Sequence, residues 1–197
     1  MTAAPTMPNP STPSLTTGRL LLDALVPADA PALFAYRADP EVARYQSFAP
    51  TGLPDAEAFI RDLPATPFGT PDTWFQLAVR RHRRAALIGD LGVHFTADGH
   101  QVEVGFTLAP THQGQGLASE AVTALLDHTL GALGKHRAFA SVDPRNAPSL
   151  ALLERIGMRR EAHFRQSLWF KGEWVDDVVY AVLRTEWSAR PGVTGAP

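Results

Sequence analysis

A glycine-containing loop that leads into a helical stretch carries the strongest chemical signal in the sequence. Its residues are Gln113, Gly114, Gln115, Gly116, Leu117, Ala118 and Ser119. The glycines remove side chains where the backbone turns, so the amides of the first helical turn, which lack partners within the helix, point outward. Together with the helix dipole they are suited to a pyrophosphate, to which Ser119 can donate its hydroxyl. The alternative is a plain tight loop whose glycines supply positive φ.

The context of this loop excludes two common nucleotide sites. A P-loop ends in Gly-Lys-Ser/Thr, and that tripeptide is absent. A dinucleotide-binding fold needs Gly-x-Gly-x-x-Gly after the first strand of a parallel unit. Here the glycines follow a predicted antiparallel hairpin in mid-chain, and Ser119 stands where the third glycine belongs.

Glu103 is the candidate general base, and it lies on the predicted strand before the loop. Side chains alternate along a strand, so positions 103, 105 and 107 share one face. If that face lines a cleft, Glu103 can accept a proton directly or through water. The alternative is a solvated carboxylate. Asp90 and His94 on the neighbouring predicted strand are reserve candidates.

Asn146 and Ser149 form a third candidate pair. Asn146 precedes Ala-Pro-Ser and is a good helix N-cap, which places Ser149 three residues into the helix. Residues three apart share one helix face, so both side chains can also reach a ligand. Capping and ligand contact do not exclude each other.

Composition excludes several classes of function. The chain has no cysteine, so it has no disulfide, thiolate nucleophile or Cys-ligated metal. The seven histidines include no pair at i, i+4, and we expect no metal. A net charge of -2 gives no general attraction for nucleic acid or anionic membrane. Without a long apolar run or a signal-like N-terminus, we expect a cytoplasmic protein.

The elements that must position these residues alternate along 197 residues, which suits one domain. Residues 1–16 are rich in proline and uncharged, so we expect a disordered tail, with a second flexible tail at 188–197. The basic turn 80–84 is expected to be a solvated hairpin tip, and the alternative is that it attracts a phosphate of a ligand or an acidic partner. Strands are predicted at 20–22, 74–79, 87–95, 102–108, 138–142, 158–169 and 174–183. Helices are predicted at 27–36, 54–63, 117–133 and 146–156.

The loop also resembles the acetyl-coenzyme A signature of the GCN5-related N-acetyltransferase family. That signature is Gln/Arg-x-x-Gly-x-Gly/Ala, and Gln113, Gly116 and Ala118 match it in register. Glutamine at 113 in place of the more usual arginine removes one positive charge, and His112 stands where this branch often has an aromatic residue. Both departures leave the acceptor open.

Two further segments resemble one branch of that family, which includes the RimJ and RimL ribosomal-protein N-terminal acetyltransferases. Residues 17–22 resemble its opening strand. Asn146-x-x-Ser149 and residues 153–158 resemble its coenzyme-contacting helix and the exit from it. The resemblance extends from about residue 17 to residue 187.

The resemblance implies one α/β domain over residues 17–187. Its central mixed sheet would have about seven mostly antiparallel strands splayed into a V, with helices on both faces. The strand 102–108 should part from the strand 138–142, which frees the backbone of Phe106, Thr107 and Leu108 to pair with the pantetheine arm of acetyl-CoA. The loop 113–119 would hold the pyrophosphate.

The resemblance also implies roles in catalysis. Asn146 would hydrogen-bond the pantetheine arm, and Ser149 would protonate the leaving thiolate. Glu103 would take the proton of a primary amine, from a protein N-terminus or a small molecule, during direct transfer in a ternary complex. The alternative is a non-catalytic module that binds or senses CoA. Similarity to the branch also leaves a homodimer open.

Overall fold

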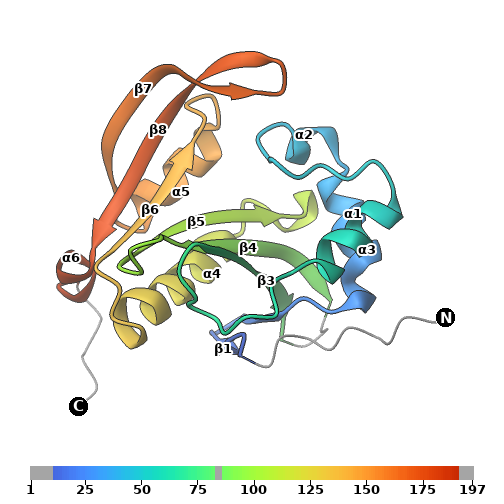
Figure 1. The fold of residues 1–197 in the computed structure, drawn as a ribbon, viewed down its shortest axis with the longest axis horizontal. Helices are drawn as coiled ribbons and strands as arrows, with labels where there is room; N and C mark the ends of the chain where they lie inside the picture. The colour runs from blue at the N-terminus through green and yellow to red at the C-terminus, as the bar shows by residue number, and fades with distance from the viewer. Residues whose placement is uncertain (1–10, 83–85, 191–197) are drawn as a thin grey trace.

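The computed structural model describes residues 11–82 and 86–190, which form one eight-stranded sheet (Figure 1). The strand order is β1-β2-β3-β4-β5-β6-β8-β7, and every pairing is antiparallel except β5 with β6. The strands are β1 Leu15–Thr16, β2 Leu20–Ala24, β3 Thr73–Arg81, β4 Leu87–Phe95, β5 Gln101–Leu108, β6 Arg137–Val142, β7 Arg159–Phe170 and β8 Glu173–Leu183. The predicted mixed, mostly antiparallel sheet is confirmed, with one strand more than the seven expected.

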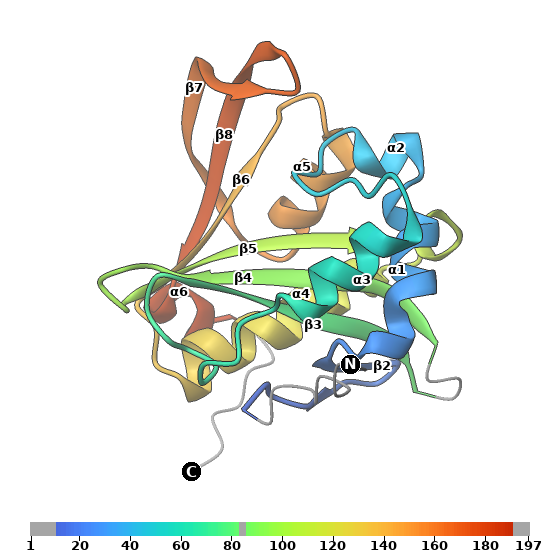
Figure 2. The same cartoon turned by 45° about the vertical axis from the view of Figure 1, so that its right-hand side comes forward.

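Helices cover both faces of the sheet, as predicted (Figure 2). The α-helices are α1 Ala30–Arg37, α2 Pro40–Ala43, α3 Leu53–Arg61, α4 Leu117–Leu126, α5 Ala147–Arg155 and α6 Arg184–Ser188. Short 3-10 turns occupy Pro27–Asp29 (η1) and Pro110–His112 (η2). None of the helices in the described residues is long and apolar enough to cross a membrane.

Two apolar cores hold the layers together, and strand alternation decides which residue joins which core. On β3, Phe75, Leu77 and Val79 join the larger core under α4. Ala78, between them, faces the smaller core formed with α1 and α3. The helix α4 follows the same logic with a period of 3.6, because its buried side chains recur along one stripe: Leu117, Ala121, Val122, Leu125 and Leu126.

The sheet opens between β5 and β6. These parallel strands pair only from Gln101 with Arg137 to Glu103 with Phe139. Beyond that point β5 continues to Leu108 and β6 continues to Val142 without pairing with each other, and the two strands diverge in Figures 1 and 2. The predicted V is confirmed, and Glu103 lies at its apex.

The predicted helix 117–133 changes character before its end. The α-helical part stops at Leu126, and Asp127–Ala132 (η3) is a π-helical segment. Its wider turns are seen in the bond from the Leu133 amide to the His128 carbonyl, five residues back. The buried Thr129 hydroxyl donates to the Leu125 carbonyl at 2.9 Å. An apolar stripe with a period of 3.6 does not distinguish these two helix types over so short a stretch.

The ordered domain extends beyond both predicted boundaries. Leu15 and Thr16, assigned to the N-terminal tail from their composition, form β1 against β2, and Leu15 packs on the larger core. At the other end Ser188 completes α6, and the Arg190 guanidinium lies over the Trp187 ring. Of the two predicted tails, residues 1–10 and 191–197 lie outside the described residues.

Arg80 is not part of a solvated tip. Its side chain points to the α1 face, where it is buried and forms ion pairs with Asp23 and Asp29, both at 2.7 Å. The hydrogen bonds that Arg80 donates to these carboxylates raise its pKa against the opposing effect of burial. Composition alone groups Arg80 with its basic neighbours, whereas strand alternation separates it from them. Arg83 and Arg84 lie outside the described residues.

Candidate active site

A cavity of about 560 Å³ opens where β5 leaves β6. Most of the predicted site residues line it, namely Phe106, Thr107, Leu108, Gln113, Gly114, Gly116, Leu117, Ala118, Ser119, Asn146 and Ser149. Gln115 and Glu103 do not line this cavity. The Gln115 side chain turns back to donate to the Thr111 carbonyl at 2.9 Å, so this residue takes part in the loop through its backbone.

The loop and first helical turn at residues 113–119, called the cradle here, have the geometry of an anion site. Gly114 and Gly116 adopt φ of 70° and 71°, and Gly116 is the N-cap of α4. The first hydrogen bond of the helix runs from the Glu120 amide to the Gly116 carbonyl, so the amides of residues 116–119 precede the helical ladder. The cradle therefore offers a run of uncommitted donors.

Ser119 adds an independent sign that the cradle faces a ligand. Its Oγ atom is buried and has no hydrogen-bond partner within residues 11–82 and 86–190. Buried hydroxyls are nearly always paired in folded proteins. Ser119 lines the cavity, so a phosphate oxygen there would satisfy this atom.

Gln113 stabilises the cradle from its first residue. Its Nε2 atom donates to the carbonyl of Leu108, the last residue of β5, at 2.9 Å. This bond joins the end of the strand to the loop that follows it. The glutamine of the signature thus has a hydrogen-bond partner in the protein itself.

Asn146 caps α5 as predicted. Its Oδ1 atom accepts from the Ser149 amide at 3.3 Å. The cap occupies the oxygen of the side-chain amide, while both residues still line the cavity. The helix α5 therefore presents Asn146 and Ser149 together, opposite the free edge of β5.

Glu103 lies at the apex, outside the cavity. We call the group formed by Trp74, His94, Glu103 and Asp177 the Glu103 side. Glu103 is half-buried and stands in register with His94 on β4 and Phe139 on β6. Burial raises the pKa of Glu103, while His94 lowers it and Asp177 on β8 raises it further. Gly105, on the same face, has open space where a side chain would be. A carboxylate with a raised pKa at an open apex is a suitable general base.

Asp90, one reserve candidate, is not available as a base. It is fully buried, and it accepts hydrogen bonds from Tyr36, Gln76 and the Arg37 guanidinium, with which it forms an ion pair. Strand periodicity places Asp90 on the same face as His94, but only the packing of α1 shows that Arg37 covers it. Asp90 is therefore part of the structural framework.

His94, the other reserve candidate, remains close to the apex. Its ring stacks on Trp74 of β3 with a centroid distance of 5.1 Å, and its Nε2 atom lies 3.5 Å from Asp72. Trp74 is about half exposed (49%), so this pair borders solvent beside Glu103. The Glu103 side comprises Trp74, His94, Glu103 and Asp177, which come from four different strands.

The rim of the cavity contains residues that the sequence analysis missed. Arg44 and Tyr45, which follow α2, line the cavity together with Arg145. The Tyr45 hydroxyl donates to the Arg145 carbonyl at 3.2 Å, and Lys171 of the β7–β8 turn donates to the Ala43 carbonyl at 2.6 Å. Figure 1 shows α2 and that turn on the same side of the molecule. The segment after α2 is a hundred residues from Arg145 in sequence, and no local pattern in it indicated a site.

A family model described as "Acetyltransferase (GNAT) domain" matches residues 19–159. The chain belongs to this acetyltransferase family. The match includes β5, the cradle, α4 and α5, and so contains Glu103, Asn146 and Ser149, whereas Lys171 and Asp177 lie beyond its end. The resemblance recognised in the signature is confirmed, and with it the assignment of the protein as an acyltransferase.

Individual GNAT proteins agree with this assignment. The uncharacterized N-acetyltransferase YnaD of Bacillus subtilis (strain 168) is 32% identical over 177 residues, which cover 88% of this chain and 99% of that one. The [ribosomal protein uS5]-alanine N-acetyltransferase of Escherichia coli (strain K12) is 32% identical over 89 residues, which cover 45% and 46% of the two chains. A GNAT-family acetyltransferase from Bacillus anthracis superposes with a TM-score of 0.80 at 28% identity, over 88% of this chain and all of that one.

These relatives also bear on the branch and on the alternative function. A ribosomal-protein N-acetyltransferase among them supports the similarity to the RimJ/RimL branch. Proteins named as N-acetyltransferases support an enzyme rather than a module that only binds CoA.

Proposed function

We propose that this GNAT protein transfers the acetyl group of acetyl-CoA directly to a primary amine within a ternary complex. The observation that carries the proposal is the position of Glu103 at the apex where β5 leaves β6. From there the free edge of β5 leads to the cradle on one side, while the Glu103 side is open on the other. The two halves of a two-substrate site thus meet at one point.

The cavity fits the parts of acetyl-CoA. The cradle amides and the unpaired Ser119 hydroxyl suit the pyrophosphate. The edge of β5 at Phe106, Thr107 and Leu108, which no longer pairs with β6, suits the amides of the pantetheine arm, which would add to the sheet like a strand, with Asn146 facing it. When bound there, acetyl-CoA supplies an activated acetyl thioester.

The protein's own groups then move the protons and stabilise charge. Most primary amines are ammonium ions at neutral pH, so Glu103 accepts a proton directly or through water to release the nucleophile. A backbone amide near Thr107 stabilises the negative charge that develops on the carbonyl oxygen. The carbon–sulfur bond then breaks, and the departing sulfur takes a proton from the Ser149 hydroxyl, which regains one from solvent water. These roles need no covalent acetyl-enzyme, and the chain has no cysteine to form one.

A positively charged amine suits the Glu103 side. Glu103 and Asp177 influence each other electrostatically, and the half-exposed Trp74 ring stacks on His94. Carboxylates attract an ammonium group, and an aromatic face also attracts cations. We therefore include both protein N-termini and small cationic amines among the acceptors.

The test is acetyl transfer by the purified full-length chain, measured as release of free thiol from acetyl-CoA with a panel of amines and N-terminal peptides. Glu103→Gln should lower kcat by about 10²–10³-fold and leave CoA affinity, measured by calorimetry, unchanged. Glu57→Gln, an exposed carboxylate on α3, is the matched control. A wild-type protein that binds CoA but acetylates no amine in the panel would support the non-catalytic module instead.

A further inference from the structure

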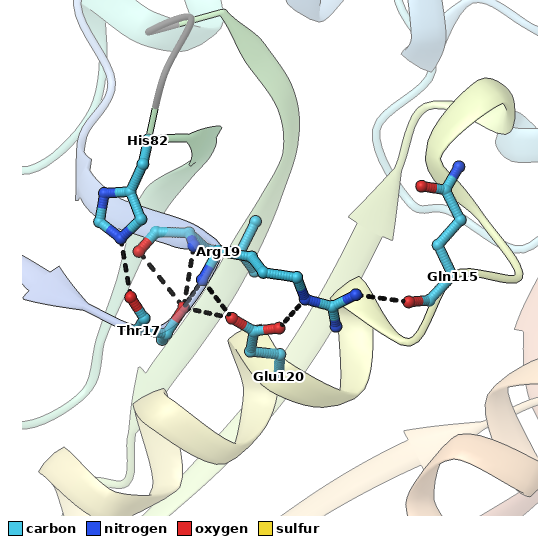
Figure 3. Close-up of polar contacts among 6 residues, drawn as sticks. Thr17, Arg19, His82, Gln115 and Glu120 are labelled. Atoms are coloured by element: carbon cyan, nitrogen blue, oxygen red, sulfur yellow. Dashed lines mark hydrogen bonds and ion pairs between the residues drawn. The ribbon is translucent and has the colours of Figure 1, made fainter.

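Arg19, the residue just before β2, reaches across to the cradle (Figure 3). Its Nε atom pairs with Glu120 Oε2 at 2.5 Å, and its Nη1 atom donates to the Gln115 carbonyl at 3.0 Å. The backbone amide of Arg19 also donates to Glu120 Oε1 at 2.9 Å. One residue from the first strands therefore holds both the loop and the first turn of α4.

The bond to Gln115 fixes the orientation of a peptide group in the cradle. A trans peptide is planar, so its carbonyl and the following amide point in opposite directions. Arg19 holds the Gln115 carbonyl on the outer side, and the amide of Gly116 must then face the other way. Gly116, with φ of 71°, lines the cavity. This glycine has the conformational freedom to turn that amide, and Arg19 removes that freedom.

The bond to Glu120 removes a charge conflict. Glu120 lies in the first turn of α4, where a carboxylate favours the helix dipole but opposes a bound pyrophosphate. Burial disfavours its charged form, yet hydrogen bonds from Thr17 and Arg19 outweigh burial and lower the pKa of Glu120. Glu120 is therefore ionised at neutral pH, and the adjacent Arg19 guanidinium forms an ion pair with it.

The segment that carries Arg19 is itself braced. The Thr17 hydroxyl donates to Glu120 Oε1 at 2.5 Å and accepts from the Leu20 amide at 2.9 Å. His82, at the end of β3, lies 2.7 Å from the Thr17 carbonyl through Nε2, and its amide donates to the Arg19 carbonyl at 3.3 Å. Figure 3 shows Thr17 and Arg19 directed to Glu120 on α4, with His82 in contact with Thr17. The guanidinium is thus held in one place although its side chain is 47% exposed.

We propose that Arg19 is a positioning residue for the pyrophosphate of acetyl-CoA: it orients the Gln115–Gly116 peptide and neutralises Glu120. This inference rests on the proposed function of the cradle. It explains how an acidic residue in the first turn of α4 is compatible with an anion bound at the cradle. It also assigns a task to the segment between β1 and β2, which is far from the signature in sequence.

The experiment compares Arg19→Met with wild type in CoA affinity, in kcat at saturating acetyl-CoA, and in kcat/KM with S-acetyl-pantetheine, which has no pyrophosphate. CoA affinity should fall on the order of tenfold, while the other two values stay within twofold. Arg19→Lys, which keeps the charge but not the planar fork, should lie between. Arg61→Met, an exposed ion-paired arginine on α3, should match wild type.

A double variant tests the electrostatic half. In Arg19→Met the charge of Glu120 is unbalanced, so Arg19→Met/Glu120→Gln should recover part of the lost CoA affinity. A purely structural role predicts a further loss, because another hydrogen-bonding group disappears. Recovery therefore supports neutralisation, and no recovery overturns it.

The outcomes separate this inference from the proposed function. Wild-type protein that binds CoA, with Arg19→Met binding it equally well, overturns the role of Arg19 alone. An equal loss with S-acetyl-pantetheine shows a general structural defect and also overturns it. Wild-type protein that does not bind CoA overturns both ideas. CoA binding without acetyl transfer overturns the proposed catalysis, while the affinity arm still decides the role of Arg19.

Discussion

The cradle and the Glu103 side are built in opposite ways. The cradle comes from one continuous stretch, residues 113–119, and its chemistry lies largely in backbone amides. The Glu103 side combines Trp74, His94, Glu103 and Asp177 from four strands. A backbone site tolerates many side chains but not a changed backbone, whereas a side-chain site depends on every strand staying in register.

The largest effect is expected from the framework under the Glu103 side. Asp90→Asn leaves the Arg37 charge buried without a partner, so the free energy of unfolding should fall by about 3–5 kcal/mol. Urea denaturation measures it. The exposed pair of Arg61 and Asp62 provides the control, since Asp62→Asn should cost about 0.5 kcal/mol or less. Equal losses in the two variants would contradict a buried framework.

The next effect concerns the cradle backbone. Gly116→Glu puts a side chain at φ of 71° and a carboxylate beside the expected pyrophosphate, so CoA affinity should fall by about 100-fold or more. Calorimetric titration measures it. Gly69→Glu introduces similar strain at φ of 99° away from the cavity and should keep the affinity of wild type. Unchanged affinity in Gly116→Glu would rule out the cradle as the pyrophosphate site.

Variants of Asn146, which both caps α5 and lines the cavity, separate capping from ligand contact. Asn146→Ala removes the cap and should cost about 1 kcal/mol of stability, or a Tm lower by about 2–4 °C, whereas Asn146→Ser keeps a capping oxygen. If Asn146 also holds the pantetheine arm, both variants should raise KM for acetyl-CoA. Normal KM in the serine variant would leave Asn146 as a cap alone.

The smallest effect is a shift in pH dependence on the Glu103 side. A base acts when deprotonated, so kcat/KM should fall as pH drops through the pKa of Glu103, which burial and Asp177 raise. Asp177→Asn removes the second cause, so the acid limb should move to lower pH while burial keeps it above the ordinary value for glutamate. Asp176→Asn, on the opposite face of β8, should leave the limb in place. A limb that moves equally in both variants would show a general charge effect.

The local features of the molecule were predictable from the sequence. The glycines of the cradle, the cap at Asn146 and the alternation of β5 each depend on residues within a few positions of one another. Apolar periodicity placed α4, α5 and the long strands close to their observed bounds. It did not predict the π-helical segment after Leu126, because both helix types bury the same stripe over one turn.

The remaining features depend on partners that are distant in the chain. From its strand position alone Asp90 could be a base, but Arg37 of α1 forms a buried ion pair with it. Arg80 lies in a basic stretch of sequence, but its side chain is paired with Asp23 and Asp29. Leu15 has the proline-rich neighbours of a tail, but it pairs with β2 and so belongs to the sheet. In each case the local composition is compatible both with an exposed residue and with a buried or paired one, so it does not distinguish them.

The sequence by itself determined the position of the cradle, because its loop conformation and helix start depend on a few consecutive residues. Only the tertiary structure decided which carboxylates are free, where β5 leaves β6, and that Arg19 supports the cradle. Burial, strand pairing and ion pairing act between residues tens of positions apart, and no local pattern records them.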